Sequence, residues 1–340
     1  MTTSEPGNRA IWKGRAWDFM EQAGMLVVLA GLVIYCALSV EHFASWQNLG
    51  SVLLAVSTVG MVSCTMLFCL ASGSFDLSVG TLLPCAGIVA GLVMGKLDTW
   101  GWFPRLAAGI GAGLGFGALV GFINGFVVAK CKINPLITTL ATMQLVRGFG
   151  LVISNSTSVT AFDPHFTVLG LGAFPVVHAA DGGLLFQMTV PVWVCLGCFL
   201  FFGLLLQWTT FGRDTLAVGG NEEAARLAGV PVDRVKIIIF TMQGVVTAIA
   251  GILLFARNQA VQQNSSQGFE LQVIAACVLG GVSLTGGIGR MSFVIAGVFI
   301  MGVVENAMAL KHVEDSYRYV VSGGILLAAV LFDRLKQRAS

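Results

Sequence analysis

The sequence predicts an all-α, polytopic membrane protein with about ten transmembrane helices, some of them broken, and with both termini in the cytoplasm. The chain of 340 residues is 56% hydrophobic and only 11% charged, whereas soluble domains usually carry roughly 25% charged residues. Its apolar residues also form long runs of the length that a bilayer requires. This composition excludes soluble multidomain and disordered chains, and the net charge of +2 gives no reason to expect a nucleic-acid partner.

The apolar runs define the predicted spans in chain order. A helix rises 1.5 Å per residue, so the roughly 30 Å hydrocarbon core needs about 20 residues. Runs of this kind lie approximately at residues 23–40, 49–71, 77–95, 106–129, 136–154, 188–207, 236–255, 271–284, 291–310 and 319–332, of which 271–284 is short. We expect a cytoplasmic N-terminal segment at 1–22, a single transmembrane domain at 23–335 and a cytoplasmic tail at 336–340.

The basic residues set the predicted orientation. If the amino terminus is cytoplasmic, most of the 19 Lys and Arg residues fall in segments on the same side, including Lys130, Lys132 and Arg213. This is the positive-inside bias of membrane proteins. It makes 208–235 the main cytoplasmic loop and 155–187 the main periplasmic loop, both too short for an independent domain. The histidines and cysteines lack the spacing of metal ligands, so we expect no metal site.

One predicted span carries a glycine at every fourth position. Gly109, Gly113, Gly117, Gly121 and Gly125 fall on one helix face between residues 106 and 129. Small residues at this spacing let another helix backbone approach closely in a bilayer. The face either packs tightly inside the chain or lines a moving seam or dimer interface.

Two segments interrupt the apolar pattern, at 72–80 and at 279–289. Broken helices at membrane depth are tolerated only where protein or a water-filled cavity satisfies the freed backbone groups. Asp76, in the first break, either caps the following helix or lines an internal path.

The loop at 208–235 contains the best-capped helix in the sequence. Asn221 is a good N-cap, Glu222 and Glu223 place negative charge in the first turn, and Gly229 can end the helix in the left-handed conformation. Arg226 lies four residues after Glu222 and can pair with it. The segment predicts a short surface helix with a small apolar side, suited to meet another surface, or else a connector.

Three motifs carry a family resemblance. Residues 219–230, GGNEEAARLAGV, resemble the ATPase-coupling loop of the ABC-importer permeases for ribose, galactose, xylose and arabinose. Residues 72–80, SGSFDLSVG, resemble the acidic-serine signature of that family, with Ser74 and Phe75 at its variable positions. The similarity runs over essentially the whole chain, and residues 133–148, 277–289 and 304–308 most resemble the L-arabinose members.

The resemblance implies the permease subunit of an ATP-driven monosaccharide importer in the bacterial inner membrane. Its implied partners are a second permease copy, a cytoplasmic ATP-binding subunit and a periplasmic sugar-binding protein, with L-arabinose, or else ribose, xylose or galactose, as the sugar. ATP and Mg²⁺ would belong to the partner ATPase, because residues 91–97, GLVMGKL, fall short of a Walker A sequence. The chain itself is thus expected to hold no cofactor and to be no enzyme.

Two groups of candidate residues follow, the first from the resemblance and the second from the chemistry of a neutral sugar. The ATPase-coupling candidates are Gly219, Gly220, Asn221, Glu222, Glu223, Ala225, Arg226 and Gly229. A neutral pentose needs hydroxyl and amide partners, so the translocation-path candidates are Ser74, Asp76, Ser78, Asn124, Thr138, Thr139, Thr142, Gln144 and Asn306. Such polar groups face a pathway or form hydrogen bonds between helices.

Two other classes of protein compete with this interpretation. A stand-alone secondary transporter or facilitator would have the same composition and would need no ATPase. An intramembrane enzyme would need a paired catalytic constellation, and the sequence has neither HExxH nor a Gly-x-Ser-x-Gly elbow.

Overall fold

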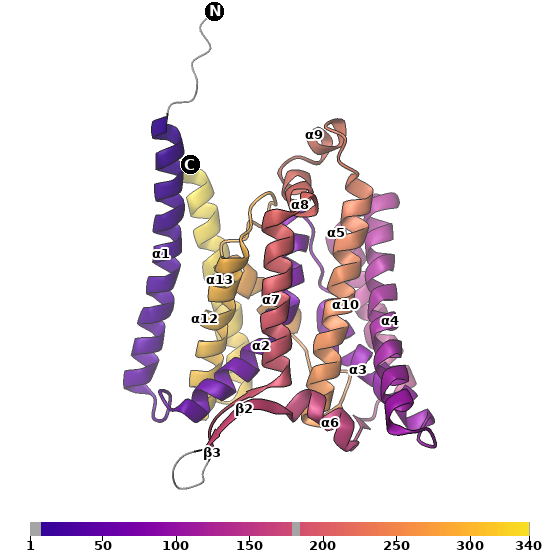
Figure 1. The fold of residues 1–340 in the computed structure, drawn as a ribbon. Coiled ribbons are helices and arrows are strands. Elements are labelled where there is room, and N and C mark those ends of the chain that lie inside the picture. Colours follow the sequence, from indigo (N-terminus) through magenta and orange to yellow (C-terminus); the bar gives the residue numbers. More distant parts are fainter. Residues whose placement is uncertain (1–7, 179–183, 340) are drawn as a thin grey trace, which may run out of the picture.

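A computed structural model describes residues 8–178 and 184–339 and shows a bundle of long helices (Figure 1). The helices are α1 (Asn8–Ser39), α2 (Trp46–Ala71), α3 (Val79–Lys96), α4 (Trp102–Lys130), α5 (Pro135–Ile153), α6 (Pro164–Leu171), α7 (Val190–Trp208), α8 (Thr210–Gly220), α9 (Glu222–Leu227), α10 (Val232–Asn258), α11 (Phe269–Leu279), α12 (Met291–Leu310) and α13 (Asp315–Ala339). The strands are β1 (Val159–Thr160), β2 (Ala173–His178), β3 (Leu184–Thr189) and β4 (Ala260–Val261).

A helix lies at each predicted apolar run, which confirms a mainly helical, multi-pass chain. Within the described residues, seven helices are long and apolar enough to cross a bilayer, namely α2, α3, α4, α5, α7, α10 and α12. The apolar part of α1, Gly24–Ser39, and α11 are shorter, so the number of ten spans stays a prediction. Helix α1 begins at Asn8 and therefore extends into the segment predicted as an N-terminal tail.

The two ends of the bundle differ in what they carry (Figure 1). The start of α1, the end of α13 and the helices α8 and α9 lie at one end, which we call the α9 end. Helix α6 and the β2–β3 hairpin lie at the opposite end, which we call the hairpin end. The two termini of the described chain are thus on the same side of the bundle, whereas which side faces the cytoplasm stays a prediction.

The long loop predicted at 155–187 is folded over much of its described length. Asp163 accepts hydrogen bonds from the backbone of His165 and Phe166 and so caps α6, and Arg105 pairs with its carboxylate. The β2 and β3 strands form an antiparallel hairpin, and β1 pairs with β4 across about 100 residues of sequence. The all-α prediction therefore describes the helical bundle but misses these short strands.

The glycine face of α4 packs inside the chain. A Cβ on Gly113 would lie 2.8 Å from the Ala86 carbonyl oxygen, and one on Gly117 would lie 2.5 Å from the Gly244 carbonyl oxygen. Gly125 meets the backbone of Ile237 at 2.8 Å in the same way. Of the two alternatives for this face, close internal packing against α3 and α10 is the one that the structure shows.

Both predicted breaks are present. Helix α2 ends at Ala71, and the chain runs without regular structure from Gly73, with φ of +73°, to the start of α3 at Val79. Helix α11 ends at Leu279, and α12 begins at Met291 after three glycines with positive φ, Gly281, Gly286 and Gly287. Only glycine takes this conformation without steric cost, which explains the glycine cluster in the second break.

Candidate functional site: the α9 knob and the buried polar network

The predicted capped helix is α9, which protrudes at the α9 end of the bundle (Figure 1). The Asn221 side chain accepts a hydrogen bond of 2.9 Å from the Ala224 backbone amide, as an N-cap does. Gly229 has φ of +90°, the left-handed conformation that ends helices. We call residues 221–229 the α9 knob.

The small apolar side of the α9 knob divides into an inner and an outer part. Ala225 is buried and belongs to the main hydrophobic core. Leu227 is 90% exposed, so its side chain contributes almost no free energy of burial to the fold. Ala225 therefore holds the knob on the bundle, and Leu227 points away from it.

Ion pairs fix the α9 knob to the ends of α4 and α10. Asp233 accepts hydrogen bonds from Lys130 at 3.0 Å, Lys132 at 2.9 Å and Arg226 at 3.2 Å. Glu222 pairs with Arg226 at 3.3 Å and with Lys236 at 2.5 Å. We call these six residues the ion cluster.

The ion cluster lowers the pKa of Glu222. Partial burial raises the pKa of the Glu222 carboxyl, but the hydrogen bonds from Lys236 and Arg226 and the positive charges of Lys236 and Lys132 outweigh this and leave the pKa below its ordinary value. Glu222 is thus ionised at neutral pH. Asp233 was missed in the sequence, where its only signal is an acid among several bases.

The end of helix α8 contacts the chain at both breaks, the one after α2 and the one between α11 and α12. A Cβ on Gly219 would collide with the Ala71 carbonyl oxygen and would lie 2.6 Å from the Gly287 nitrogen. A Cβ on Gly286 would lie 2.7 Å from the Gly219 carbonyl oxygen, and the Gly287 amide donates to Ala71 O at 2.9 Å. We call Ala71, Gly219, Gly286 and Gly287 the glycine junction. Gly220 differs from Gly219, because a Cβ there would meet nothing within 4 Å.

Four of the predicted path residues form one buried hydrogen-bond chain. Asp76 Oδ1 accepts from the Ser78 amide at 2.9 Å and from Ser78 Oγ at 2.6 Å. Ser78 Oγ in turn accepts from Asn124 Nδ2 at 3.1 Å, and Thr142 donates to Asn124 Oδ1 at 2.6 Å. The first break, α4 and α5 thus meet in a polar network, which we call the Asp76 network.

Two oxygen atoms beside this network have no hydrogen-bond partner within the described chain, namely Asp76 Oδ2 and Ser74 Oγ. Both side chains are almost completely buried. A buried polar atom without a hydrogen-bond partner lowers the stability of the fold by about 1–3 kcal/mol. A ligand, a water molecule or another conformation of the chain would supply the missing partners.

The other predicted path residues do not join the Asp76 network. Thr138 donates to Asn134 O at 3.1 Å. Thr139 Oγ1 lies 2.9 Å from Pro135 O of its own helix and 3.3 Å from Phe75 O in the first break, so it contacts the segment that carries Asp76 but no member of the network. Gln144 is an exposed residue of α5.

Asn306 exchanges hydrogen bonds of 2.9 and 2.8 Å with Asn48 at the first turn of α2, whereas Asp76 follows the other end of that helix. At 1.5 Å per residue, the part of α2 from Asn48 to Ala71 is roughly 35 Å long. In this conformation Asn306 therefore joins two helices and lies far from the network.

Comparison with known proteins agrees with this geometry. Residues 48–330 match the family described as branched-chain amino acid transport system, permease component. The chain is 53% identical over 326 residues to the L-arabinose transport system permease protein AraH of Escherichia coli, covering 96% of this chain and 93% of that protein. It is 41% identical to the L-arabinose ABC transporter permease protein AraH of Azospirillum brasilense, over 96% and 91% of the two chains.

A third relative is named for a different sugar. The ribose import permease protein RbsC of Bacillus subtilis is 36% identical, over 93% of this chain and 94% of that one. The family match covers most of the sequence, and all three relatives are matched nearly end to end. With its multi-pass bundle, its protruding capped helix and its matched residues 48–330, the chain belongs to the family of transport-system permease components.

Proposed function

We propose that the chain is the transmembrane permease subunit of an ATP-driven importer for L-arabinose, which forms the translocation path by alternating access. The observation that carries the proposal is the α9 knob, a protrusion held by Ala225 and the ion cluster, which directly follows α8, whose Gly219 meets both breaks at the glycine junction. The sugar is proposed from the names of the relatives at 53% and 41% identity.

The proposal includes the partners and the orientation. The functional unit contains a second copy of this permease, a cytoplasmic ATP-binding subunit that holds ATP and Mg²⁺, and a periplasmic sugar-binding protein. The α9 end lies in the cytoplasm, with both termini, and the hairpin end faces the periplasm. This orientation is supported by the basic residues around α9, where Lys130, Lys132 and Arg226 meet.

The geometry supports a direct route for the movement. When ATP closes the partner ATPase, its surface displaces the α9 knob and with it α8, because Ala225 and the ion cluster fix the knob to the bundle. Gly219 passes the displacement to Ala71 and Gly287, at the edges of the two breaks. The first break continues into Asp76, so the movement reaches the polar network that we propose as part of the path.

The chemistry of the Asp76 network favours a neutral, hydroxyl-rich substrate. Its members are one carboxylate, two hydroxyls and one amide, which suit sugar hydroxyl groups as donors and acceptors. An amino acid, which the family description names, carries a carboxylate and would need a basic partner that these four residues do not include. Ribose, xylose and galactose remain the alternative sugars.

Transport in proteoliposomes tests the proposal. The chain is reconstituted with its ATP-binding subunit and its sugar-binding protein, and uptake of labelled L-arabinose is measured with each component omitted in turn. We expect uptake only when all components and ATP are present. L-Arabinose uptake by the chain alone, without ATP, would identify a facilitator and overturn the proposal, and preferential uptake of leucine would overturn the assignment of the sugar.

A further inference from the structure

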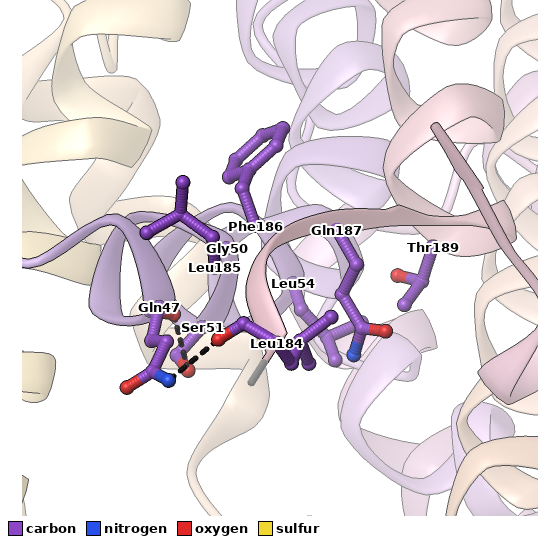
Figure 2. A pocket seen from close by; sticks show the side chains of 9 residues that line it. All are labelled: Gln47, Gly50, Ser51, Leu54, Leu184, Leu185, Phe186, Gln187 and Thr189. Atoms are coloured by element: carbon purple, nitrogen blue, oxygen red, sulfur yellow. Dashed lines mark hydrogen bonds between the residues drawn. The ribbon is translucent and has the colours of Figure 1, made fainter. Parts of the chain in front are cut away.

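A cavity at the hairpin end is separate from the Asp76 network. It has a volume of about 250 Å³ and lies between the first turns of α2 and the strand β3. Figure 2 shows its lining side chains, among them Gln47, Ser51, Gln187 and Thr189. A cavity of this size has room for several waters or for one small sugar.

Local packing builds this cavity. Gly50 lets β3 approach α2 closely, since a Cβ there would lie 3.0 Å from the Gln187 carbonyl oxygen. The Gln47 amide donates a hydrogen bond of 2.6 Å to the Leu184 carbonyl and so holds the start of the strand against the helix. The cavity walls are thus two elements that contact each other directly.

The Thr189 hydroxyl is the second observation that indicates a ligand. Thr189 is only 3% exposed, and its Oγ1 has no hydrogen-bond partner within the described chain. It occupies the N-cap position of α7 but makes no side-chain cap bond, although Thr usually caps at such a position. In Figure 2 its oxygen points toward the side of the cavity where Gln187 lies. A ligand hydroxyl would satisfy this buried group.

We infer that this cavity is an entry subsite for a neutral monosaccharide, bound through Thr189 Oγ1 and the side-chain amide of Gln187. The inference rests on the proposed function for the choice of sugar and for the side from which the sugar arrives. Hydroxyl and amide groups recognise an uncharged polyol. A site on a transport route must also release its ligand, so the expected affinity is in the millimolar range.

The structure provides its own reporter for binding. The Trp46 and Phe186 rings contact each other edge to face at a centroid distance of 6.4 Å, and Phe186 lines the cavity. A sugar that moves Phe186 changes the environment of Trp46. The test uses the full-length chain in lipid nanodiscs, titrated with L-arabinose, with tryptophan emission and equilibrium binding of labelled L-arabinose as readouts and Trp46→Phe as the reporter control.

Thr189→Val separates binding from folding. Because the hydroxyl is unpartnered without ligand, its removal leaves the melting temperature of the sugar-free chain unchanged or higher, and it weakens L-arabinose binding about three- to tenfold through the lost hydrogen bond. Gln187→Leu weakens binding by a similar factor. The matched control is Thr247→Val, which removes another buried, unpartnered hydroxyl away from the cavity and leaves the L-arabinose affinity unchanged.

Three outcomes overturn the inference. These are the absence of any L-arabinose response in both readouts, wild-type affinity in Thr189→Val, and an equal response to L-leucine. If ATP-dependent uptake in proteoliposomes persists while the permease alone gives no response, the entry subsite is wrong and the proposed function stands. If uptake is independent of ATP but the cavity binds L-arabinose, the proposed function is wrong and the subsite stands.

Discussion

At Gly219, a hydrogen atom in place of a side chain lets three segments of the chain touch through their backbones. The end of α8 meets the end of α2 at Ala71 and the second break at Gly286 and Gly287. When one segment moves, a direct backbone contact moves its neighbour with it, whereas a flexible side chain between them could change its rotamer instead. We therefore expect position 219 to tolerate a side chain poorly.

Gly219→Ala tests this contact. The added methyl group has no room and forces the junction apart, which we expect to cost about 1–3 kcal/mol of stability and to lower L-arabinose uptake at least tenfold per ATP hydrolysed. The matched control is Gly220→Ala, where a Cβ meets open space and uptake should stay normal. Equal behaviour of the two variants, measured as uptake and ATP hydrolysis in proteoliposomes, would contradict the role of the junction.

Asp76 divides its two oxygen atoms between two roles. Oδ1 is occupied by the amide and hydroxyl of Ser78, which orders the turn into α3. Oδ2 has no hydrogen-bond partner in the described chain, and we propose it as the atom that a substrate hydroxyl meets. The sequence left open whether Asp76 caps a helix or lines a path. In the structure Oδ1 orders the turn before α3, and a path role for Oδ2 stays a prediction.

Asp76→Asn separates these roles. Asparagine keeps the acceptor for Ser78, so the chain should insert and melt as the wild type does, but its neutral amide loses the stronger charge-assisted acceptor. We expect L-arabinose uptake to fall at least tenfold. Asn306→Ala provides the contrast, since it breaks the pair with Asn48 and should lower the melting temperature while folded protein transports normally. Wild-type uptake by Asp76→Asn would leave Asp76 with a structural role alone.

Among the elements, α9 has the least stability of its own. Six residues form too short a helix to persist alone in water, so the Asn221 cap, Ala225 in the core and the ion cluster must hold it. The cap could be predicted, because its signals lie within ten residues of one another. The pairing of Asp233 with Lys130 and Lys132 could not, because it joins residues about 100 positions apart.

Leu227→Asp tests what α9 contacts. Leu227 is almost fully exposed in the isolated chain. A charge there should therefore change the free energy of unfolding of the permease by no more than about 0.5 kcal/mol. If this side chain docks into the ATP-binding subunit, burial of the charge should weaken that association at least tenfold. Co-purification and a binding titration measure the effect, with Leu227→Met as the conservative control. Unchanged association would exclude Leu227 from the interface.

Reversal of a charge on the same helix gives a second readout. Arg226→Glu places a negative charge beside Glu222 and Asp233, to which Arg226 is hydrogen-bonded. We expect the knob to shift, and L-arabinose uptake and sugar-stimulated ATP hydrolysis to fall together, while the chain still inserts. Gly229→Pro should act in the same direction, because proline cannot adopt the φ of +90° found there. Normal uptake by both variants would contradict the coupling role of α9.

For the whole molecule, Cys131 reports the orientation. It is exposed and lies between Lys130 and Lys132, at the α9 end, whereas the other described cysteines are buried or half-buried. With a cytoplasmic α9 end, a membrane-impermeant maleimide should label Cys131 in inverted membrane vesicles but not in intact cells. Cys131→Ser is the control for labelling elsewhere, and labelling in intact cells would reverse the proposed topology.

Features that depend on residues close together in the sequence could be predicted, whereas features that depend on distant residues could not. Apolar runs, caps and glycine spacing are local, and from them the helices, the α9 knob and both breaks could be predicted. The Asp76 network was predicted only as a set of candidates, because Ser78, Asn124 and Thr142 come from different segments, and Gln144 and Asn306 have the same chemistry but lie elsewhere. The β1–β4 ladder and the cavity beside β3 depend on tertiary packing, which no local pattern shows.

The β1–β4 ladder has a mechanical consequence. Its pairs, Val159 with Val261 and Thr160 with Ala260, join the segments that follow α5 and α10, and a hydrogen bond of 3.1 Å from Gln259 to Thr167 adds α6 to the same tie. This end of the bundle is thus cross-braced, while the opposite end carries the protruding knob. If the proposed force acts at α9, we expect the segments that follow α5 and α10 to move as one unit at this end of the bundle, because the ladder joins them.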